Sequence, residues 1–445
     1  MAKKLHFRKE HVMANTRHHW TWISCVSLRA GAIGLALASM FVLTVVATQQ
    51  AHAQTFSVVH NFTGADGADP LAGLTIDRGG NLYGTTYRGG STGLGTVYML
   101  AHNGSGWNFN SLYSFAGGND GAKPYGRVIF GRNGTLYGTT SQGGNSSCSG
   151  GCGTVFNLKP VPASVVCAGL CPWTETVLYR FTGTNGAGPS GDLVFDQAGN
   201  LYGTTYVGGG MGGPDGAGVV YKLTAAGVES TLYTFPETGC TAGADPFGGV
   251  IFDNTGNLYG TTRSTGAYGC GNGVVFQLSP SGSGWIENVL YTFQNGTDGG
   301  LPHAGLISDQ TGKLYGATSS GGQGGGGTVF QMTPPGSSWT FNTLYGFTGS
   351  GGPQGNLIMD QSGNLYGTTV SDGAHGFGSV FKLTLSGAGT WTYTSLYDFT
   401  GGSDGANPYS NLVFDASGNL YGTASAGGTG SACSGDCGVV FEITP

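Results

Sequence analysis

Gly199-Asn200-Leu201-Tyr202-Gly203-Thr204-Thr205 is the stretch that decides the fold, because close copies of it recur along the whole chain. Its Leu-Tyr-Gly core occurs seven times, at intervals of 51 to 65 residues. The tyrosines of these copies are Tyr83, Tyr137, Tyr202, Tyr259, Tyr315, Tyr366 and Tyr421. Residues 54–445 therefore divide into seven units of about 56 residues, and no stretch is left for a second domain.

Each unit predicts four short strands. An apolar run such as Gly191–Asp196 comes first and leads into a turn whose glycine supplies a positive φ. The repeated heptapeptide is rich in aromatic and β-branched residues and predicts the second strand. Gly153–Leu158 is typical of the third strand and Ser111–Phe115 of the fourth. Short strands separated by turn residues indicate an all-β sandwich, barrel or propeller.

The two ends of the repeat array decide among these folds. Thr55–Phe62 matches a fourth strand with no first three strands before it. Gly438–Ile443 matches a third strand with no fourth strand after it. The N-terminal strand is therefore expected to complete the last unit, which closes a ring and leaves no open sheet edge. We predict an all-β, seven-bladed β-propeller over residues 54–445.

The composition agrees with this fold and excludes others. Glycine accounts for 88 of 445 residues, and a helical bundle would lose roughly 1 kcal/mol at each helical glycine. Glycine does not recur at every third residue, which excludes collagen. Apolar residues make up 39% of the chain and aromatic residues 11%, enough to bury a core that a disordered chain lacks.

Residues 1–53 are predicted to be a signal peptide. A basic segment is followed by the uncharged apolar run 30–48, and Ala51-His52-Ala53 forms a small-x-small cleavage site before Gln54. The alternative is an uncleaved membrane anchor, because the apolar run approaches the length that spans a bilayer. Translation that starts at Met13 would shorten the basic segment.

Removal of the leader changes the charge of the chain. The leader holds six of the 17 basic residues and one of the 23 acidic ones, so the mature chain keeps 11 and 22, a net charge of −11. This acidic balance argues against nucleic acid and anionic membranes as partners. We expect a monomer that is secreted or periplasmic and that does not insert into the membrane after cleavage.

Eight cysteines remain after export, and an even number in an exported chain predicts disulfides. Two pairs lie in corresponding loops between second and third strands, and one pair lies in the longest connection between a third and a fourth strand. Cys240 and Cys270 lie in loops expected on one face of a blade. The predicted pairs are Cys148–Cys152, Cys433–Cys437, Cys167–Cys171 and Cys240–Cys270. Zinc binding by the first two pairs is the alternative.

The repeat Gly-Asn-Leu-Tyr-Gly-Thr-Thr, followed by Gly-Thr-Val-Phe-x-Leu, resembles the GloVer tandem-repeat family of exported bacterial proteins. The resemblance covers essentially all of the mature chain. It implies a propeller-like secreted repeat protein whose relatives carry varied anchoring signals at their ends. No general biochemical activity comes with the resemblance.

Function is expected where the repeats differ, because positions shared by all units serve the fold. The residue after the proline that precedes each first strand varies most, and so does the residue two positions further on. If the first strand is innermost, these side chains lie at the mouth of a central funnel, where they suit a small polar ligand. Irregular filling of the channel is the alternative. The candidate binding residues are Tyr125, Arg127, Asp192, Phe247, His303, Gln354, Asn356, Tyr409 and Asn411.

Other motifs have a structural and a functional interpretation. The turn aspartates, such as Asp196, are expected to bond their own backbone turns, and the Leu-Tyr-Gly tyrosines to pack between blades. Acids such as Asp66 and Asp404, which precede the prolines, either build turns or bind a cation such as calcium. The tryptophans at the fourth strands either cover a hairpin or stack on sugars. Loop residues expected at the rim of the funnel are Tyr206, Arg263, Tyr268, Asp372 and His375.

The residues favour a non-catalytic binding or interaction propeller, whose ligand is a carbohydrate or an extracellular protein. No metal signature, cofactor motif or catalytic triad stands out, and no cofactor or metal is expected. The alternative is an extracellular carbohydrate-active hydrolase or lyase that uses His303 in the funnel. A purely structural surface protein is a third possibility.

Overall fold

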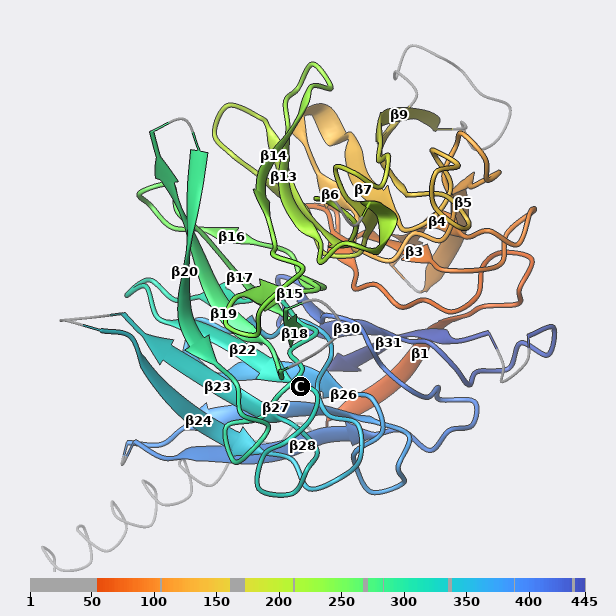
Figure 1. Cartoon of the computed structure of the whole chain (residues 1–445). Helices are drawn as coiled ribbons and strands as arrows, with labels where there is room; N and C mark the ends of the chain where they lie inside the picture. The colour runs from red at the N-terminus through yellow and green to blue at the C-terminus, as the bar shows by residue number, and fades with distance from the viewer. Residues whose placement is uncertain are drawn as a thin grey trace, which may run out of the picture. The chain divides into compact units, whose positions relative to one another are not determined.

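The computed structural model describes residues 54–444, except 105, 161–172, 211–212, 267–270, 283, 335–337, 388 and 434–436. The chain from Gln54 onwards forms one compact unit built of antiparallel sheets around a common axis (Figure 1). Seven sheets serve as blades, which confirms the predicted seven-bladed propeller. We number the blades 1 to 7 in the chain order of their innermost strands. The predicted leader lies outside the described residues.

The innermost strands are two residues long in every blade. They are β2 (Thr75–Ile76), β6 (Ile129–Phe130), β11 (Val194–Phe195), β16 (Ile251–Phe252), β21 (Ile307–Ser308), β25 (Ile358–Met359) and β29 (Val413–Phe414). The repeated heptapeptide forms the second strands, which are almost wholly buried. These are β3 (Leu82–Thr86), β7 (Leu136–Thr140), β12 (Leu201–Val207), β17 (Leu258–Thr262), β22 (Leu314–Thr318), β26 (Leu365–Thr369) and β30 (Leu420–Ala424).

The third strands follow glycine-rich loops and pair antiparallel with the second strands. They are β4 (Thr96–His102), β8 (Thr154–Lys159), β13 (Val219–Leu223), β19 (Val274–Ser281), β23 (Thr328–Thr333), β27 (Ser379–Leu385) and β31 (Val439–Thr444). The fourth strands form the outer edges of the blades. They are β5 (Trp107–Ser114), β9 (Thr174–Arg180), β14 (Glu229–Thr234), β20 (Gly284–Thr292), β24 (Thr340–Gly346), β28 (Trp391–Asp398) and β1 (Thr55–Asn61).

Strand β1 closes the ring. It pairs antiparallel with β31, from Thr55 opposite Thr444 to Asn61 opposite Val439, and Figure 1 shows these two strands side by side. This is the predicted closure by the N-terminal strand. It removes the free edge that an open array of blades would expose.

Two blades have a further short strand pairing, at a position where other blades have an isolated β-bridge. In blade 3, β10 (Ala187–Pro189) adds a further pairing to β12. In blade 4, β15 (Gly243–Ala244) pairs with β18 (Ser264–Thr265) above the main sheet. Blades 1, 2, 5 and 7 have an isolated antiparallel bridge at the same position, between the residue two before the proline and the residue two after the second strand. The pairing is therefore a shared feature of the repeat that is longer in blades 3 and 4. Two short 3₁₀ turns, Arg132–Gly134 and Gly213–Asp215, complete the elements.

The core is divided into seven apolar clusters, each shared by two neighbouring blades. The cluster between blades 7 and 1 joins Tyr421 and Val440 to Leu82 and Tyr98. The phenylalanine of each Leu-Tyr-x-Phe motif is at most 1% exposed, including Phe62 at the closing strand. Most of the stability of the ring is therefore expected to come from packing between blades.

Threonine side chains add hydrogen bonds between neighbouring blades near the axis. The hydroxyls donate to backbone carbonyls of the next blade, and Thr423 to Ala72, at 3.0 Å, joins the last blade to the first. The others are Thr85 to Gly126, Thr204 to Gly248, Thr261 to Ala304 and Thr368 to Ser410. The Thr139 hydroxyl, at the same position in blade 2, is buried without a hydrogen-bond partner in the described structure.

The turn aspartates and the repeated tyrosines have the predicted structural roles. Asp196 accepts the backbone N–H of Asn200 at 2.8 Å and the Tyr202 hydroxyl at 3.2 Å. Equivalent bonds from the tyrosine to the turn aspartate recur in five other blades. Burial raises the pKa of Tyr202 to about 12, so its hydroxyl stays a donor.

The cysteine prediction is confirmed where the structure describes both partners. Cys148 is disulfide-bonded to Cys152, and Cys433 to Cys437, which excludes zinc binding by these pairs in this state. Cys240 is also disulfide-bonded. Cys167, Cys171 and Cys270 lie outside the described residues. Within the part of the chain that is described, no helix is long and apolar enough to cross a membrane.

Candidate functional site

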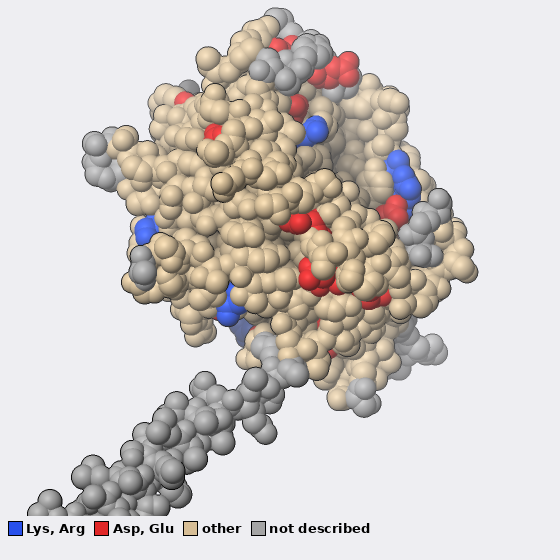
Figure 2. Space-filling view, turned by 90° about the horizontal axis from the view of Figure 1, so that it is seen from below, with Lys and Arg blue, Asp and Glu red and all other residues tan. Residues whose placement is uncertain are grey.

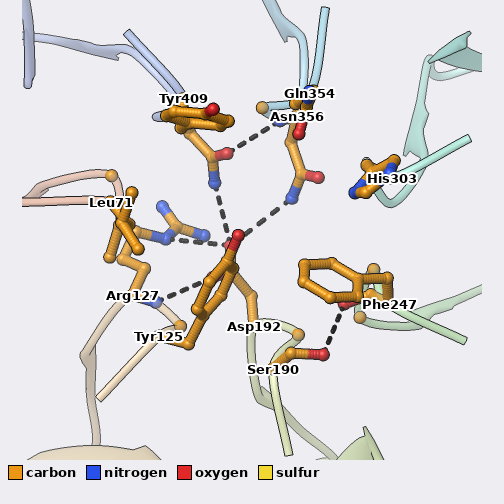
Figure 3. A pocket seen from close by; sticks show the side chains of 18 residues that line it. Leu71, Tyr125, Arg127, Ser190, Asp192, Phe247, His303, Gln354, Asn356 and Tyr409 are labelled. Carbon is orange, nitrogen blue, oxygen red and sulfur yellow. Dashed lines mark hydrogen bonds and ion pairs between the residues drawn. The ribbon is translucent and has the colours of Figure 1, made fainter. Parts of the chain in front are cut away.

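The residues that precede the innermost strands meet around one pocket on the axis, to which all seven blades contribute (Figure 3). We call it the funnel pocket. Its cavity has a volume of about 50 Å³, so it is a shallow bowl. Its lining residues are Leu71, Ala72, Gly73, Tyr125, Gly126, Arg127, Ser190, Gly191, Asp192, Phe247, Gly248, Gly249, His303, Gln354, Gly355, Asn356, Tyr409 and Asn411.

Small residues let the blades approach closely at this depth. A Cβ atom on Gly191 would lie 2.5 Å from the backbone nitrogen of Gly249, and one on Gly248 would lie 2.4 Å from that of Gly305. Such distances are far below van der Waals contact, so side chains cannot be accommodated there. The glycines therefore narrow the channel, and the larger side chains on either side of them project toward the axis.

Asp192 is the centre of a polar network at the base of the pocket. Its carboxylate lies 3.2 Å from Arg127 Nε in an ion pair, and it accepts the Arg127 backbone N–H at 3.0 Å. Asn411 Nδ2 donates to the same carboxylate at 3.0 Å and Asn356 Nδ2 at 3.4 Å. Figure 3 shows these interactions converging on Asp192. Side chains from blades 2, 3, 6 and 7 are thus tied together across the axis.

The same side chains also bond the backbone of the preceding blade. Asn356 Oδ1 accepts the N–H of Gly305 at 2.6 Å, and Asn411 Oδ1 accepts the N–H of Asn356 at 2.7 Å. Asp192 does the same for Arg127. We call Arg127, Asp192, Asn356 and Asn411 the polar girdle. Its hydrogen bonds hold the base of the funnel in a fixed arrangement.

A run of aromatic rings covers one side of the funnel. Phe247 is central: its ring centroid lies 5.1 Å from that of Tyr125 and 5.2 Å from that of Tyr206. Tyr87 extends the run, 6.0 Å from Tyr125. The rings meet at angles between 75° and 88°, the edge-to-face geometry that aromatic pairs favour. We call Tyr87, Tyr125, Phe247 and Tyr206 the aromatic arc.

His303 lies beside the arc, with its ring 5.0 Å from that of Phe247. Burial, and secondarily the charge of Arg263, lowers the pKa of His303 to about 4. The imidazole is therefore neutral at pH 7. Its Nδ1 is buried and has no hydrogen-bond partner in the described structure, so it can bond a ligand or a water molecule.

Cationic side chains stand at the two ends of the aromatic arc. At one end, the Lys123 ammonium lies 5.5 Å from the centre of the Tyr87 ring, and Arg88 lies 5.8 Å from it. At the other end, Arg263 Nη1 donates to the Tyr206 hydroxyl at 3.4 Å. Both distances to Tyr87 are within the range of cation–π attraction.

The nine predicted binding residues all line the funnel pocket. The structure contains no ligand, so their role in binding stays a prediction. Of the residues expected at the rim, Tyr206 contacts Phe247 of the pocket and Arg263 contacts Tyr206, although neither lines the pocket itself. Tyr268 lies outside the described residues. Asp372 and His375 do not line the pocket, and the Asp372 charge acts on Tyr345 and Tyr393 of outer strands.

Sequence reasoning missed Tyr87, Arg88 and Lys123. A signal for the first was present, because Tyr87 stands directly after the repeated heptapeptide, as do Tyr206 and Arg263 in their blades. Lys123 stands directly before the proline of blade 2 and adopts a positive φ of 56°. Its approach to Tyr87 of blade 1 depends on the packing of two blades and has no sequence pattern.

The acids that precede the prolines build turns. Asp404 accepts the backbone N–H groups of Thr400 and Gly402 together with the Tyr397 hydroxyl, and Asp298 has equivalent bonds. These carboxylates lie in their own loops rather than in a ring at the axis. Among the described residues, no group of three or more histidine, cysteine and acidic side chains is placed to hold a metal ion.

A second cavity, of about 220 Å³, continues the channel beyond the polar girdle. Aliphatic residues of the innermost strands line it, such as Val194, Ile251, Ile307 and Ile358. The girdle thus separates a polar and aromatic funnel from an aliphatic channel.

Charged side chains are sparse on the propeller surface. The face in Figure 2 shows isolated acidic and basic residues on a broad uncharged background. Of the 11 basic residues in residues 54–445, Arg88, Lys123, Arg127 and Arg263 lie at or next to the funnel. Two of these four, Arg88 and Arg127, are paired with acids.

Comparisons with known proteins identify the repeat and the fold. The model of the Gloeobacter/Verrucomicrobia repeat matches residues 43–272 and 248–445, which confirms the resemblance inferred from the repeated motifs. No curated protein matches the sequence.

Solved structures are similar in fold at low sequence identity. The extracellular domain of a proposed one-component system from B. thetaiotaomicron is 10% identical, with a TM-score of 0.52 over 87% of this chain and 40% of that one. A proposed 6-phosphogluconolactonase from Bacteroides uniformis is 15% identical, with a TM-score of 0.49 over 84% and 99% of the two chains. An aldose sugar dehydrogenase from Streptomyces coelicolor is 11% identical, with a TM-score of 0.43 over 88% and 98%.

Proposed function

We propose that this chain, which belongs to the Gloeobacter/Verrucomicrobia repeat family, is an exported binding propeller that takes carbohydrate at its funnel pocket. The observation that carries the proposal is the aromatic arc beside the polar girdle. Saccharides present apolar C–H faces and polar hydroxyl edges. A site that pairs half-buried aromatic rings with a few placed polar groups matches both kinds of surface.

The position of the arc supports a function beyond folding. The repeats are nearly identical where they form strands and turns, yet the residue after the proline at the funnel is of six kinds in seven blades. Tyr125 and Phe247 are partly exposed, whereas the phenylalanines of the blade cores are at most 1% exposed. Aromatic surface left uncovered at a concave site is typical of a ligand-binding surface.

The polar girdle favours binding over catalysis. Asp192 is the one carboxylate among the described residues that line the pocket. Arg127, Asn356 and Asn411 already occupy its oxygens. A carboxylate that acts as nucleophile or general base would have to give up these partners, so the arrangement suits a rigid binding surface.

Secretion or transfer to the periplasm is part of the proposal. Disulfides persist in oxidising compartments, and two are present in strand-connecting loops. The predicted leader and its cleavage site supply the route. N-terminal sequencing of the exported protein tests this, because cleavage after Ala53 leaves Gln54 as the first residue.

A glycan-array screen tests the proposed ligand class, with Phe247→Ala as the site variant and Phe377→Ala as its matched control. Phe377 is 42% exposed in a loop of blade 6 and does not line the pocket. We expect the parent protein and Phe377→Ala to bind the same saccharides and Phe247→Ala to lose them. Equal binding by all three proteins, or no saccharide bound, would contradict the proposal.

An extracellular hydrolase or lyase is the second candidate, and His303 favours it. Its neutral imidazole has a free Nδ1 in the pocket and can accept a proton. A reducing-sugar release assay on the saccharides that bind distinguishes the two functions. Turnover that His303→Ala abolishes would establish the enzyme, whereas binding without turnover supports the binding propeller.

A further inference from the structure

The aromatic arc and the cations at its ends form one continuous line of contacts. Lys123 lies over Tyr87, which contacts Tyr125, and Tyr125 contacts Phe247. Phe247 contacts Tyr206, whose hydroxyl bonds Arg263. The line runs over blades 1 to 4, so only part of the ring carries it. It offers apolar ring surface in the middle and a positive charge at each end.

The two end cations differ from the other cations of the funnel because they have no ion-pair partner within the described residues. Arg88 is paired with Asp69 at 3.3 Å and Arg127 with Asp192 at 3.2 Å. The charge of Arg263 acts on Asp245, whose carboxylate accepts the Ser264 hydroxyl at 2.5 Å rather than forming an ion pair with the guanidinium. Arg263 Nε is buried and has no hydrogen-bond partner in the described structure, so it can meet an acceptor on a ligand.

The repeat position directly after the heptapeptide indicates that the repeat does not require Tyr87, Tyr206 or Arg263. In blades 2, 5 and 7 this residue is a serine whose hydroxyl bonds the carbonyl before the proline, for example Ser141 to Lys123 at 2.8 Å. Blades 1, 3 and 4 have Tyr87, Tyr206 and Arg263 instead. A small capping residue suffices for the fold, so the three large side chains serve the funnel.

We infer that the aromatic arc binds acidic carbohydrate, a short saccharide whose rings lie on Tyr125 and Phe247 and whose carboxylates meet Lys123 and Arg263. This inference rests on the proposed function and specifies its ligand class. Guanidinium and ammonium groups form strong charge-assisted hydrogen bonds with carboxylates. His303 supplies a neutral partner for a hydroxyl of the same saccharide.

The charge of the rest of the chain sets the length of the ligand. Residues 54–445 carry a net charge of −11, which repels a long polyanion. A short acidic saccharide places its charges on the two cations and extends little over the acidic surface. We therefore expect acidic di- and trisaccharides to have a lower dissociation constant than the long polymer, when both are expressed per mole of saccharide chains.

Calorimetric titration tests this inference with di- and trisaccharides of galacturonic, glucuronic and mannuronic acid and with their methyl esters. The esters keep the ring faces and lose the negative charge. We expect at least one acid to bind about ten-fold more tightly than its ester, and the difference to shrink between 50 and 500 mM NaCl, because salt screens exposed charges. Equal affinity for every acid and its ester would overturn the inference.

Variants at the ends of the arc give an independent readout. Lys123→Gln and Arg263→Gln are each expected to weaken acid binding several-fold and leave ester binding unchanged. Lys382→Gln is the matched control, because Lys382 lies 5.3 Å from the centre of the Tyr366 ring, away from the funnel. Thermal melting shows that each variant is folded. An equal loss of acid binding in Lys382→Gln would contradict the assignment.

The results separate this inference from the proposed function. Neutral saccharides bound at the funnel with no preference for acids would refute the inference and keep the proposed function. No binding of acids, esters or array saccharides would refute both.

Discussion

Asp192→Asn is the substitution that tests most directly how the base of the funnel is held. The carboxylate of Asp192 accepts from Arg127, Asn356 and Asn411. An asparagine of the same shape keeps one oxygen for the Arg127 backbone N–H. Its amide nitrogen would replace the oxygen that faces the other three donors. The substitution therefore places a hydrogen-bond donor, the amide nitrogen of asparagine, at a position that only donors surround.

The size of the effect follows from these contacts. Hydrogen bonds to a charged group contribute about 1.5–3 kcal/mol, and a donor left without an acceptor adds a desolvation cost. The side chain of Asp192 is 16% exposed and that of Arg127 is 31% exposed, so water can partly satisfy the guanidinium. We expect Asp192→Asn to lower the free energy of unfolding by about 2 kcal/mol.

Equilibrium urea unfolding of the oxidised protein measures this loss, provided that tryptophan fluorescence and far-ultraviolet circular dichroism give one transition. Asp215→Asn is the control, because Asp215 is exposed and lies outside the polar girdle. A double-mutant cycle with Arg127→Met isolates the ion pair, and we expect a coupling energy of about 1 kcal/mol. A loss below about 0.5 kcal/mol for Asp192→Asn, equal to the control, would refute the reasoning.

Three further predictions concern the ring and the histidine. Thr423→Val should lower the free energy of urea unfolding by about 1 kcal/mol, because it removes the hydrogen bond to Ala72 that joins blade 7 to blade 1. Thr139→Val should leave it unchanged, since the Thr139 hydroxyl has no hydrogen-bond partner in the described structure, and equal losses would contradict this prediction. Gly249→Ala should lower the free energy of unfolding by about 2 kcal/mol, since the new Cβ would lie 2.3 Å from the Asp192 carbonyl oxygen. Gly284→Ala is the control and should have no such effect, because a Cβ there would meet open space. An unchanged stability of Gly249→Ala would show that the blades can separate. Because burial lowers the pKa of His303 to about 4 in the folded protein, the unfolded chain binds the proton more readily, and the free energy of unfolding should fall by up to about 3 kcal/mol as the pH drops from about 6.5 to 4. Urea unfolding midpoints measured over this pH range should fall less for His303→Gln than for the parent protein. Parallel curves for the two proteins would refute the pKa shift.

Most of the fold could be predicted because the decisive features are repeated or terminal. Seven copies of the heptapeptide indicate the number of blades, and the unmatched strands at Thr55–Asn61 and Val439–Thr444 indicate their closure. The additional pairings of β10 and of β15 with β18 could not be predicted. They lengthen a contact that is an isolated bridge in blades 1, 2, 5 and 7, and segments of two or three residues are too short for an alternating pattern to mark a strand.

The pocket was predictable in its composition and less so in its contacts. Variation after each proline indicated the lining residues, because residues at one repeat position meet at one depth of the ring. The partners within the pocket depend on which blades face each other across the axis. Asp192 in blade 3 bonds Asn356 in blade 6 and Asn411 in blade 7, and only the closed ring brings these distant positions together.

Outward and inward loops also look alike in the sequence. Asp372 and Arg263 both follow a second strand, and both were expected at the rim. Asp372 bonds the next backbone N–H in its own loop, at Gly373, whereas Arg263 reaches the Tyr206 hydroxyl of the preceding blade. The direction of a loop depends on its glycine conformations, so composition alone does not determine which side chains reach the axis.

A crystal structure of the protein with its tightest-binding saccharide from the array tests the central claim most directly. The account predicts saccharide density in the funnel pocket, with a ring against Phe247 or Tyr125 and a polar group at His303, Lys123 or Arg263. Saccharide bound in another groove, with only water in the funnel, would contradict it.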